Sequence, residues 1–156
     1  MKRIPRISLR VALATAGAMA LMAAVAPAPA QAAPPPGYTV STWRYGDDLV
    51  MYISNEAGIE IGWAEFQADP NGFEIPGDAI RASDRYADGL GVEAWLDINP
   101  GSTFQTDRIA STRGINSPYT TPYKTGNIAE GTRIGLRLCL VQGSLTYCSG
   151  TQYSVA

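Results

Sequence analysis

Apolar and polar residues alternate along several short segments of the chain, which is the pattern of half-buried β-strands. In the segment 91–98, for example, Val92, Ala94, Leu96 and Ile98 point to one face, and the residues between them point to the other. Turn-forming Gly, Pro, Asn and Asp residues separate such segments about every eight to twelve residues, as in all-β sandwiches and barrels. No segment after the first 32 residues keeps a helical period, so the pattern predicts an all-β domain.

The apolar pattern changes face once, within the segment 59–68. Ile61 and Trp63 share one face there, whereas Phe66 and Ala68 share the opposite one. A β-bulge, or a strand buried on both faces, explains such a change. We expect Trp63 and Phe66 to lie in the core.

The segment 134–151 contains both cysteines of the chain, placed symmetrically about Gly143-Ser144. Glycine at the first central position suits a two-residue type II′ turn. With that turn, Cys139 faces Cys148 on a non-hydrogen-bonded pair, where Cα atoms lie about 4.5 Å apart and a disulfide can form. The spacing is not that of a CxxC redox motif, which favours a structural bridge. One face of the hairpin is predicted to join the core: Ile134, Leu136, Leu138, Leu140, Leu145 and Tyr147.

Residues 1–32 have the features of a secretory signal peptide. Four basic residues precede an apolar run, 11–25, that is short for a membrane span. Ala30 and Ala32 supply the small residues that signal peptidase prefers. We therefore expect a secreted, extracellular product, which suits a disulfide because oxidising compartments preserve one.

Beyond the leader, the sequence predicts two parts. Residues 33–37 are rich in proline and alanine and should form a disordered arm. Residues 38–156 suit a single domain with one core.

The charge balance bears on the partners of the protein. The chain has 12 basic and 14 acidic residues, and four of the basic ones lie in the leader. The remainder therefore carries eight basic residues against 14 acidic ones, a net charge near −6. Nucleic acid and anionic membranes require a positive surface, so neither is an expected partner.

The chain contains no histidine. That absence excludes Ser-His-Asp and Cys-His catalysis, histidine-ligated zinc and an imidazole pH switch. Lys124 is the only lysine after the leader, and Thr121 stands where a Ser-x-x-Lys motif needs serine. Paired carboxylates could still hydrolyse a glycosidic bond. The candidate acids are Glu60, Glu65, Asp84, Asp88, Glu93 and Asp97.

Three acids, Asp78, Asp84 and Asp88, raise the separate hypothesis of a calcium site built from loop oxygens. Their spacing is not that of an EF-hand. Asp88 followed by Gly89 is also a hairpin signal, and Asp84 can hydrogen-bond to its own loop backbone. Both interpretations, calcium and turn chemistry, stay open at this point.

Several aromatic residues fall where the pattern does not predict core. Trp95 stands between Glu93 and Asp97 on the face opposite the apolar residues of its strand, so we expect all three to point outward. Exposed aromatic rings flanked by polar groups stack on sugar rings or anchor protein partners. The predicted ligand-binding residues are Trp95, Glu93, Asp97, Tyr119 and Tyr123. Trp43 and Tyr45 are two further aromatic residues in a weakly patterned segment. The alternative is that a second sheet or a long loop covers Trp95.

The segment 77–94, GDAIRASDRYADGLGVEA, followed by LRLC and YCSG, resembles the small secreted β-sandwich proteins common in actinobacteria. The resemblance rests on the spacing of Asp, Gly and Cys residues. It implies the secreted compartment and the β-sandwich fold, and it implies no activity or mechanism.

Together these features predict a single antiparallel β-sandwich of immunoglobulin-like, Greek-key type, with about seven to eight strands and one hairpin disulfide. The predicted function is that of a secreted, non-catalytic binding module for a polysaccharide, a cell-surface component or a protein. One alternative is an inhibitor of a secreted hydrolase that presents the proline-bearing loop 113–127. Another is a small carboxylate-based hydrolase, and calcium is the one cofactor considered.

Overall fold

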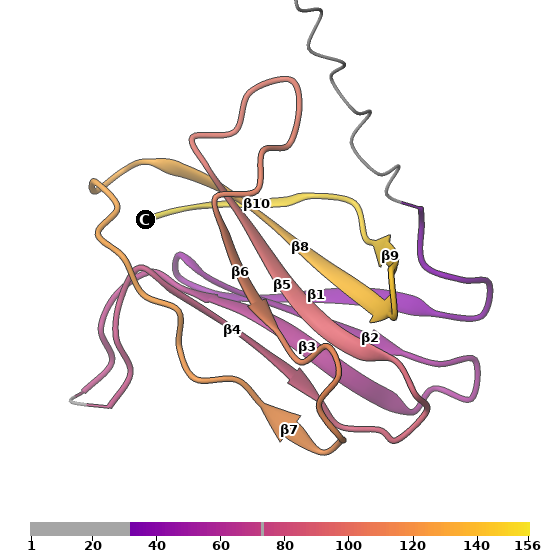
Figure 1. The fold of residues 1–156 in the computed structure, drawn as a ribbon. Helices are drawn as coiled ribbons and strands as arrows, with labels where there is room; N and C mark the ends of the chain where they lie inside the picture. The colour runs from indigo at the N-terminus through magenta and orange to yellow at the C-terminus, as the bar shows by residue number, and fades with distance from the viewer. Residues whose placement is uncertain (1–31, 73) are drawn as a thin grey trace, which may run out of the picture.

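The computed structural model describes residues 32–72 and 74–156, so the signal peptide predicted at 1–32 lies outside the described residues apart from Ala32. The described residues form ten β-strands and no helix, and the all-β prediction is confirmed (Figure 1). Accordingly, none of them forms a helix that could cross a membrane. The strands are β1 (Thr39–Tyr45), β2 (Asp48–Ser54), β3 (Glu60–Gln67), β4 (Ala79–Asp84), β5 (Gly91–Ile98), β6 (Arg108–Ser111), β7 (Tyr119–Thr120), β8 (Arg133–Gln142), β9 (Leu145–Cys148) and β10 (Gln152–Val155).

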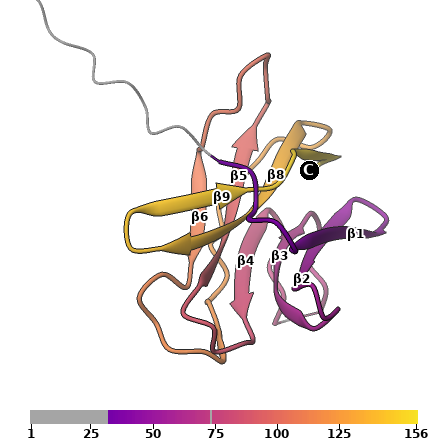
Figure 2. The ribbon, with the colours of Figure 1, turned by 90° about the vertical axis from the view of Figure 1, so that its right-hand side faces the viewer.

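The strands make two antiparallel sheets. One has the order β1-β2-β3-β4-β7, and the other has the order β10-β8-β5-β6 with β9 paired to the far end of β8. Figure 2 shows the two sheets edge-on as two layers. The structure has more strands than the seven to eight predicted, partly because β7 has only two residues and lies in a segment without an alternating pattern.

The core lies between the two layers and takes residues from both sheets. Inward-facing positions are the apolar ones, as strand alternation requires. Phe66, predicted to be core, is 0 % exposed. The buried core cluster consists of Leu49, Met51, Ile53, Ile61, Ala64, Phe66, Ala68, Ile80, Ala82, Val92, Ala94, Leu96, Ala110, Ile128, Ile134, Leu136, Leu138, Leu140 and Ala156.

The change of face predicted in the segment 59–68 is a β-bulge. Ile53 of β2 pairs with Gly62, whereas the next residue of β2 pairs with Glu60, which leaves Ile61 as the additional residue of β3. The bulge lets Ile61 join the core and turns Trp63 to the outer face. The prediction that Trp63 is core is therefore wrong: its side chain is half-buried and is not part of the core cluster.

The C-terminal hairpin has the predicted register. Cys139 pairs with Cys148 and forms a disulfide with it, and the two Cα atoms lie 4.0 Å apart. Gly143 has φ = 55°, the positive angle that a primed hairpin turn requires at this position. Leu145 departs from the prediction, because it lies next to the turn and is 51 % exposed.

Replacing both Cys139 and Cys148 with serine should lower the free energy of unfolding by roughly 2 to 3 kcal/mol. The bridge closes a short loop, with a sequence separation of nine, and so removes a limited amount of chain entropy from the unfolded state. Urea unfolding of the oxidised wild type and the double variant checks this value. A variant as stable as the wild type would show that the disulfide contributes nothing to the fold.

Two segments expected to lack regular structure make backbone hydrogen bonds with the rest of the domain or within themselves. In the arm 33–37, Pro34 and Pro35 are half-buried, and the Pro35 carbonyl accepts a hydrogen bond from the Tyr38 amide. The segment 113–127, predicted to be a long loop, instead runs along the edge of β4. Its residues 119–120 form β7, and farther along Lys124 makes an isolated bridge to Ile80.

Candidate functional site

Glu93 and Asp97, expected on a solvent-exposed face, are buried, with exposed fractions of 4 % and 2 %. The Glu93 carboxylate accepts hydrogen bonds from Trp95 Nε1 at 2.8 Å, Ser111 Oγ at 2.6 Å and Arg113 Nε at 3.1 Å. The Asp97 carboxylate accepts one from the backbone amide eight residues farther along, at 2.6 Å. Buried carboxylates satisfied in this way hold the outer layer of the sheet together.

Trp95 belongs to the same structural network. It is half-buried and packs against the cluster of Cys139, Val141 and Cys148 on the outer face of its sheet. Its indole Nε1–H, the one polar group of the side chain, donates a hydrogen bond to Glu93. The alternative interpretation of Trp95, as a covered residue, therefore describes its surroundings better than free exposure does.

The five predicted ligand-binding residues do not come together. Trp95, Glu93 and Asp97 lie on β5, in one sheet, whereas Tyr119 pairs with Asp84 at the edge of the other sheet. Tyr123 follows β7 along that same edge and stacks beneath the guanidinium of a β4 residue. Tyr123 therefore belongs to the outer surface of that sheet, where other aromatic rings also lie.

That surface is the outer side of the β1-β2-β3-β4-β7 sheet, and we call it the aromatic face. Tyr52 of β2 pairs with Trp63 of β3, and Trp43 of β1 pairs with Val50, whose neighbour Met51 points into the core. Alternation along the strands therefore turns these rings outward. The aromatic face consists of Trp43, Tyr45, Tyr52, Trp63 and Tyr123.

The aromatic rings on β1 are exposed, whereas the rings next to β4 are held in place by contacts with Arg81. Trp43 is 54 % exposed and Tyr45 is 71 % exposed, and their rings are nearly parallel, at 9°, with centroids 6.1 Å apart. The Arg81 guanidinium lies 4.9 Å from the Trp63 centroid and 4.4 Å from the Tyr123 centroid. Because these cation–π contacts restrain the two rings, little ordering of them is needed when a ligand binds.

Two charged side chains, those of Arg81 and Glu65, lie next to the rings of Trp63 and Tyr123. Arg81 pairs with the carboxylate of Glu65, which lies next to it in the sheet register. Burial raises the pKa of the Tyr123 hydroxyl, and the nearby Glu65 charge raises it further. The hydroxyl is buried and has no hydrogen-bond partner in the part of the chain that the structure describes.

A polar hollow of about 340 Å³ adjoins the exposed end of the aromatic face at Tyr45. The Asp48 carboxylate has a structural role. It accepts hydrogen bonds from Gln67 Nε2 at 2.7 Å and from the backbone amide of the residue after Gln67. The carboxylates of Asp47 and Asp69 are exposed and accept no hydrogen bond from the described residues. They are acceptors available to a ligand that donates hydroxyl protons.

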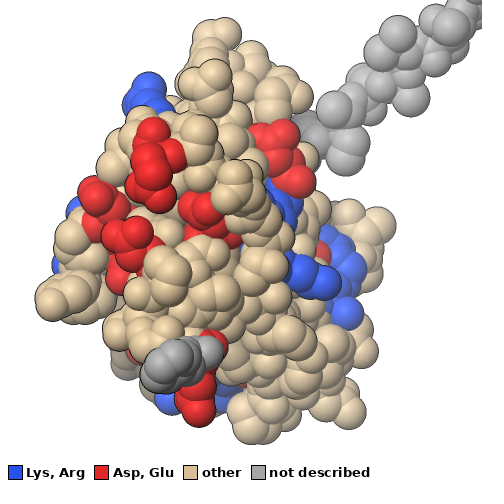
Figure 3. Space-filling view, turned by 90° about the vertical axis from the view of Figure 1, so that its left-hand side faces the viewer, with Lys and Arg blue, Asp and Glu red and all other residues tan. Residues whose placement is uncertain are grey.

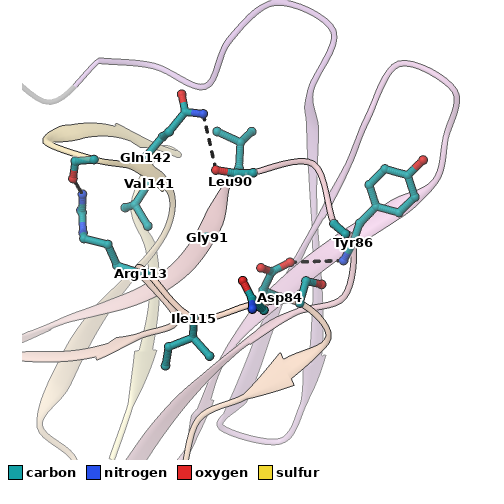
Figure 4. A pocket seen from close by; sticks show the side chains of 14 residues that line it. Asp84, Tyr86, Leu90, Gly91, Arg113, Ile115, Val141 and Gln142 are labelled. Carbon is teal, nitrogen blue, oxygen red and sulfur yellow. Dashed lines mark hydrogen bonds between the residues drawn. The ribbon is translucent and has the colours of Figure 1, made fainter.

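A second, larger hollow of about 510 Å³ opens at one end of the molecule (Figure 4), and we call it the end hollow. Three segments form it: the chain between β4 and β5, the turn that begins at Arg113, and the hairpin turn at Gly143. Figure 4 shows the Asp84 carboxylate beside the amide of Tyr86, and the Gln142 side chain reaching the backbone at Gly89.

Asp84 is the buried acid of the end hollow, with an exposed fraction of 3 %. Burial raises the pKa of its carboxyl, the Tyr86 amide and the nearby Ser117 hydroxyl oppose this rise, and the charge of Asp88 adds to it. The Ser117 hydroxyl oxygen is buried and makes no hydrogen bond of ordinary geometry with the described residues. A perturbed carboxyl inside a hollow is a usual feature of functional sites.

The acids of the other sequence hypotheses are engaged separately. Asp78 accepts a hydrogen bond from the Ile128 amide, and Asp84 and Asp88 each accept one from the amide two residues later, the turn chemistry described above. Residues 32–72 and 74–156 contain no cluster of three or more acidic or cysteine side chains suited to a metal ion. Among the hydrolase candidates, three glutamates form ion pairs with three different arginines: Glu60 with Arg85, Glu65 with Arg81 and Glu93 with Arg113.

Acidic side chains gather over the upper half of the surface drawn in Figure 3. This face of the molecule therefore carries several of the acidic residues counted from the sequence. Such a surface favours neutral or cationic ligands over anionic ones.

No protein-family model, curated protein or solved structure matches the chain.

Proposed function

We propose that this protein is a secreted, extracellular binding module that holds a polysaccharide on its aromatic face. The observation that carries the proposal is the alignment of five aromatic side chains on the outer side of one sheet, with Trp43 and Tyr45 more than half exposed. A monomeric protein that keeps large rings in water at one place usually uses them for binding.

The chemistry of the aromatic face fits a carbohydrate. The apolar C–H faces of sugar rings pack flat on tryptophan and tyrosine rings, while sugar hydroxyls need acceptors at the edge. Asp47 and Asp69, at the hollow beside Tyr45, supply such acceptors. From β1 to β4 the sheet spans three strand spacings, about 14 Å, so a chain of sugars can cross several rings.

The compartment, the fold type and the resemblance belong to the same proposal. The leader and the disulfide support secretion through a signal peptide. Pairing of β5 with β8, with β6 and β7 between them in the chain, supports an immunoglobulin-like sandwich of Greek-key type. Membership of the small secreted β-sandwich proteins of actinobacteria fits both features.

Replacing Trp43 or Tyr45 with alanine should weaken polysaccharide binding about tenfold each, because a well-stacked ring contributes on the order of 1.4 kcal/mol. Binding isotherms on a panel of insoluble polysaccharides, made with the mature protein, measure the effect. Tyr86→Ala is the matched control, since Tyr86 is also exposed, at 41 %, but lies between β4 and β5, at the end hollow.

The control should bind as the wild type does. Equal losses for Tyr45→Ala and Tyr86→Ala would place binding elsewhere. If no polysaccharide of the panel is retained, while a protein from the culture fluid is retained through Trp43 and Tyr45, the ligand is a protein.

A further inference from the structure

The end hollow contains a buried carboxylate that has no cationic partner. The described residues form three ion pairs, and Asp84 is in none of them. A carboxylate that is 3 % exposed and unpaired is costly in its charged form. The fold therefore keeps, at one end, an acid that a positive group from outside could neutralise.

Arg113 lines the same hollow but forms its ion pair with Glu93 and not with Asp84. Its Nε donates to Glu93, its NH1 reaches the Gly143 and Leu145 carbonyls, and its NH2 donates to Thr146 at 3.0 Å. Figure 4 shows its side chain directed away from Asp84, toward the hairpin turn. Because the guanidinium is held by these partners, the negative charge of Asp84 is not balanced from within the hollow.

The other groups around Asp84 suit a positively charged donor. The Ser117 hydroxyl is buried beside the carboxyl with a free acceptor oxygen. Asp88 does not line the hollow, but its charge raises the pKa of Asp84, so it adds negative potential near that carboxyl. Tyr86 lines the hollow through its backbone amide, and Figure 4 shows its ring directed away from Asp84. The charged and titratable groups around Asp84 include Tyr86, Asp88 and Arg113, Tyr119, which pairs with Asp84, Tyr38, which lies near Asp88, and Arg85, whose guanidinium is paired with Glu60.

We propose that the end hollow is a binding site for the ammonium group of a small organic cation, with Asp84 as its counter-ion and the Ser117 hydroxyl as a second acceptor. The three N–H donors of an ammonium group match these oxygens. The site is separate from the aromatic face and does not depend on the polysaccharide proposal.

The test is a titration of ¹⁵N-labelled mature protein with butylammonium chloride, followed by amide chemical shifts. We expect saturable shifts at Tyr86, Gly91 and Ser117. The uncharged isostere 1-butanol and sodium chloride at equal ionic strength should produce no saturable shift there. Affinity should increase as pH rises through the raised pKa of Asp84, because the ammonium group binds the ionised carboxylate.

Asp84→Asn should weaken butylammonium binding at least tenfold, since asparagine can still accept the Tyr86 amide but carries no charge. Asp88→Asn, at a position that does not line the hollow, should weaken it less. The inference is overturned if Asp84→Asn binds as the wild type does, or if 1-butanol produces the same shifts. It is also overturned if wild-type affinity does not change with pH, a result that needs no variant to fold.

Discussion

Phe66→Ala should lower the free energy of unfolding by about 3 to 5 kcal/mol, the largest effect we expect from a single side chain. Phe66 is one of the largest fully buried side chains and lies in the core between the two sheets. Removing its ring takes away buried apolar area and leaves a cavity, since neighbours held in regular strands can move only a little. Equilibrium unfolding in urea gives the difference.

Phe104→Ala is the control for that measurement. Phe104 is half-buried outside the core cluster, where the Arg137 guanidinium covers its ring. Its replacement should cost about 1 kcal/mol, mainly the lost cation–π contact. Similar losses for the two variants would mean that the core does not lie between the sheets as described.

Glu93→Ala should lower the free energy of unfolding by about 3 kcal/mol, although sequence pattern alone would class Glu93 as a surface acid. Its side chain is 6 % exposed and accepts hydrogen bonds from Trp95, Ser111 and Arg113. Removing the carboxylate leaves these donors without their partner. Arg113 is about one third exposed and can regain water, which places the loss at the low end for a buried ion pair.

Glu60→Ala is the matched variant for Glu93→Ala. Glu60 pairs with Arg85 at the surface, with side-chain exposures of 36 % and 58 %, so its loss should change stability by about 0.5 kcal/mol or less. Urea unfolding of both variants at one salt concentration makes the comparison. A Glu93 variant as stable as the Glu60 variant would contradict the structural role assigned to the Glu93 network.

The C-terminal hairpin was predictable because two constraints agree there. A glycine that can adopt positive φ fixes the turn, and the turn fixes which cysteines face each other. The β-bulge of β3 was predictable for a similar reason, since a change in apolar phase requires an additional residue. The pattern does not show at which residue the phase changes, and for this reason it wrongly predicts Trp63 to be a core residue.

The candidate site was harder to predict, because alternation tells which residues share a face but not what covers that face. Glu93 and Trp95 do lie on the outer face, yet the disulfide cluster and Arg113 cover them. Conversely, Trp43 and Tyr45 stand two residues apart, a spacing that places both rings on one side of a strand. That spacing was the available signal, and only the pairing of β1, β2 and β3 joins these rings to Trp63.

The most direct test of the aromatic face uses the three tryptophans of the chain. In the ¹⁵N spectrum of the mature protein, each indole gives one Nε1–H signal, which soluble fragments of a retained polysaccharide can shift. We expect shifts for Trp43 and Trp63 and none for Trp95, whose Nε1–H donates a hydrogen bond to Glu93 at 2.8 Å. Saturable binding that shifts Trp95 and leaves Trp43 and Trp63 unchanged would contradict binding at the aromatic face.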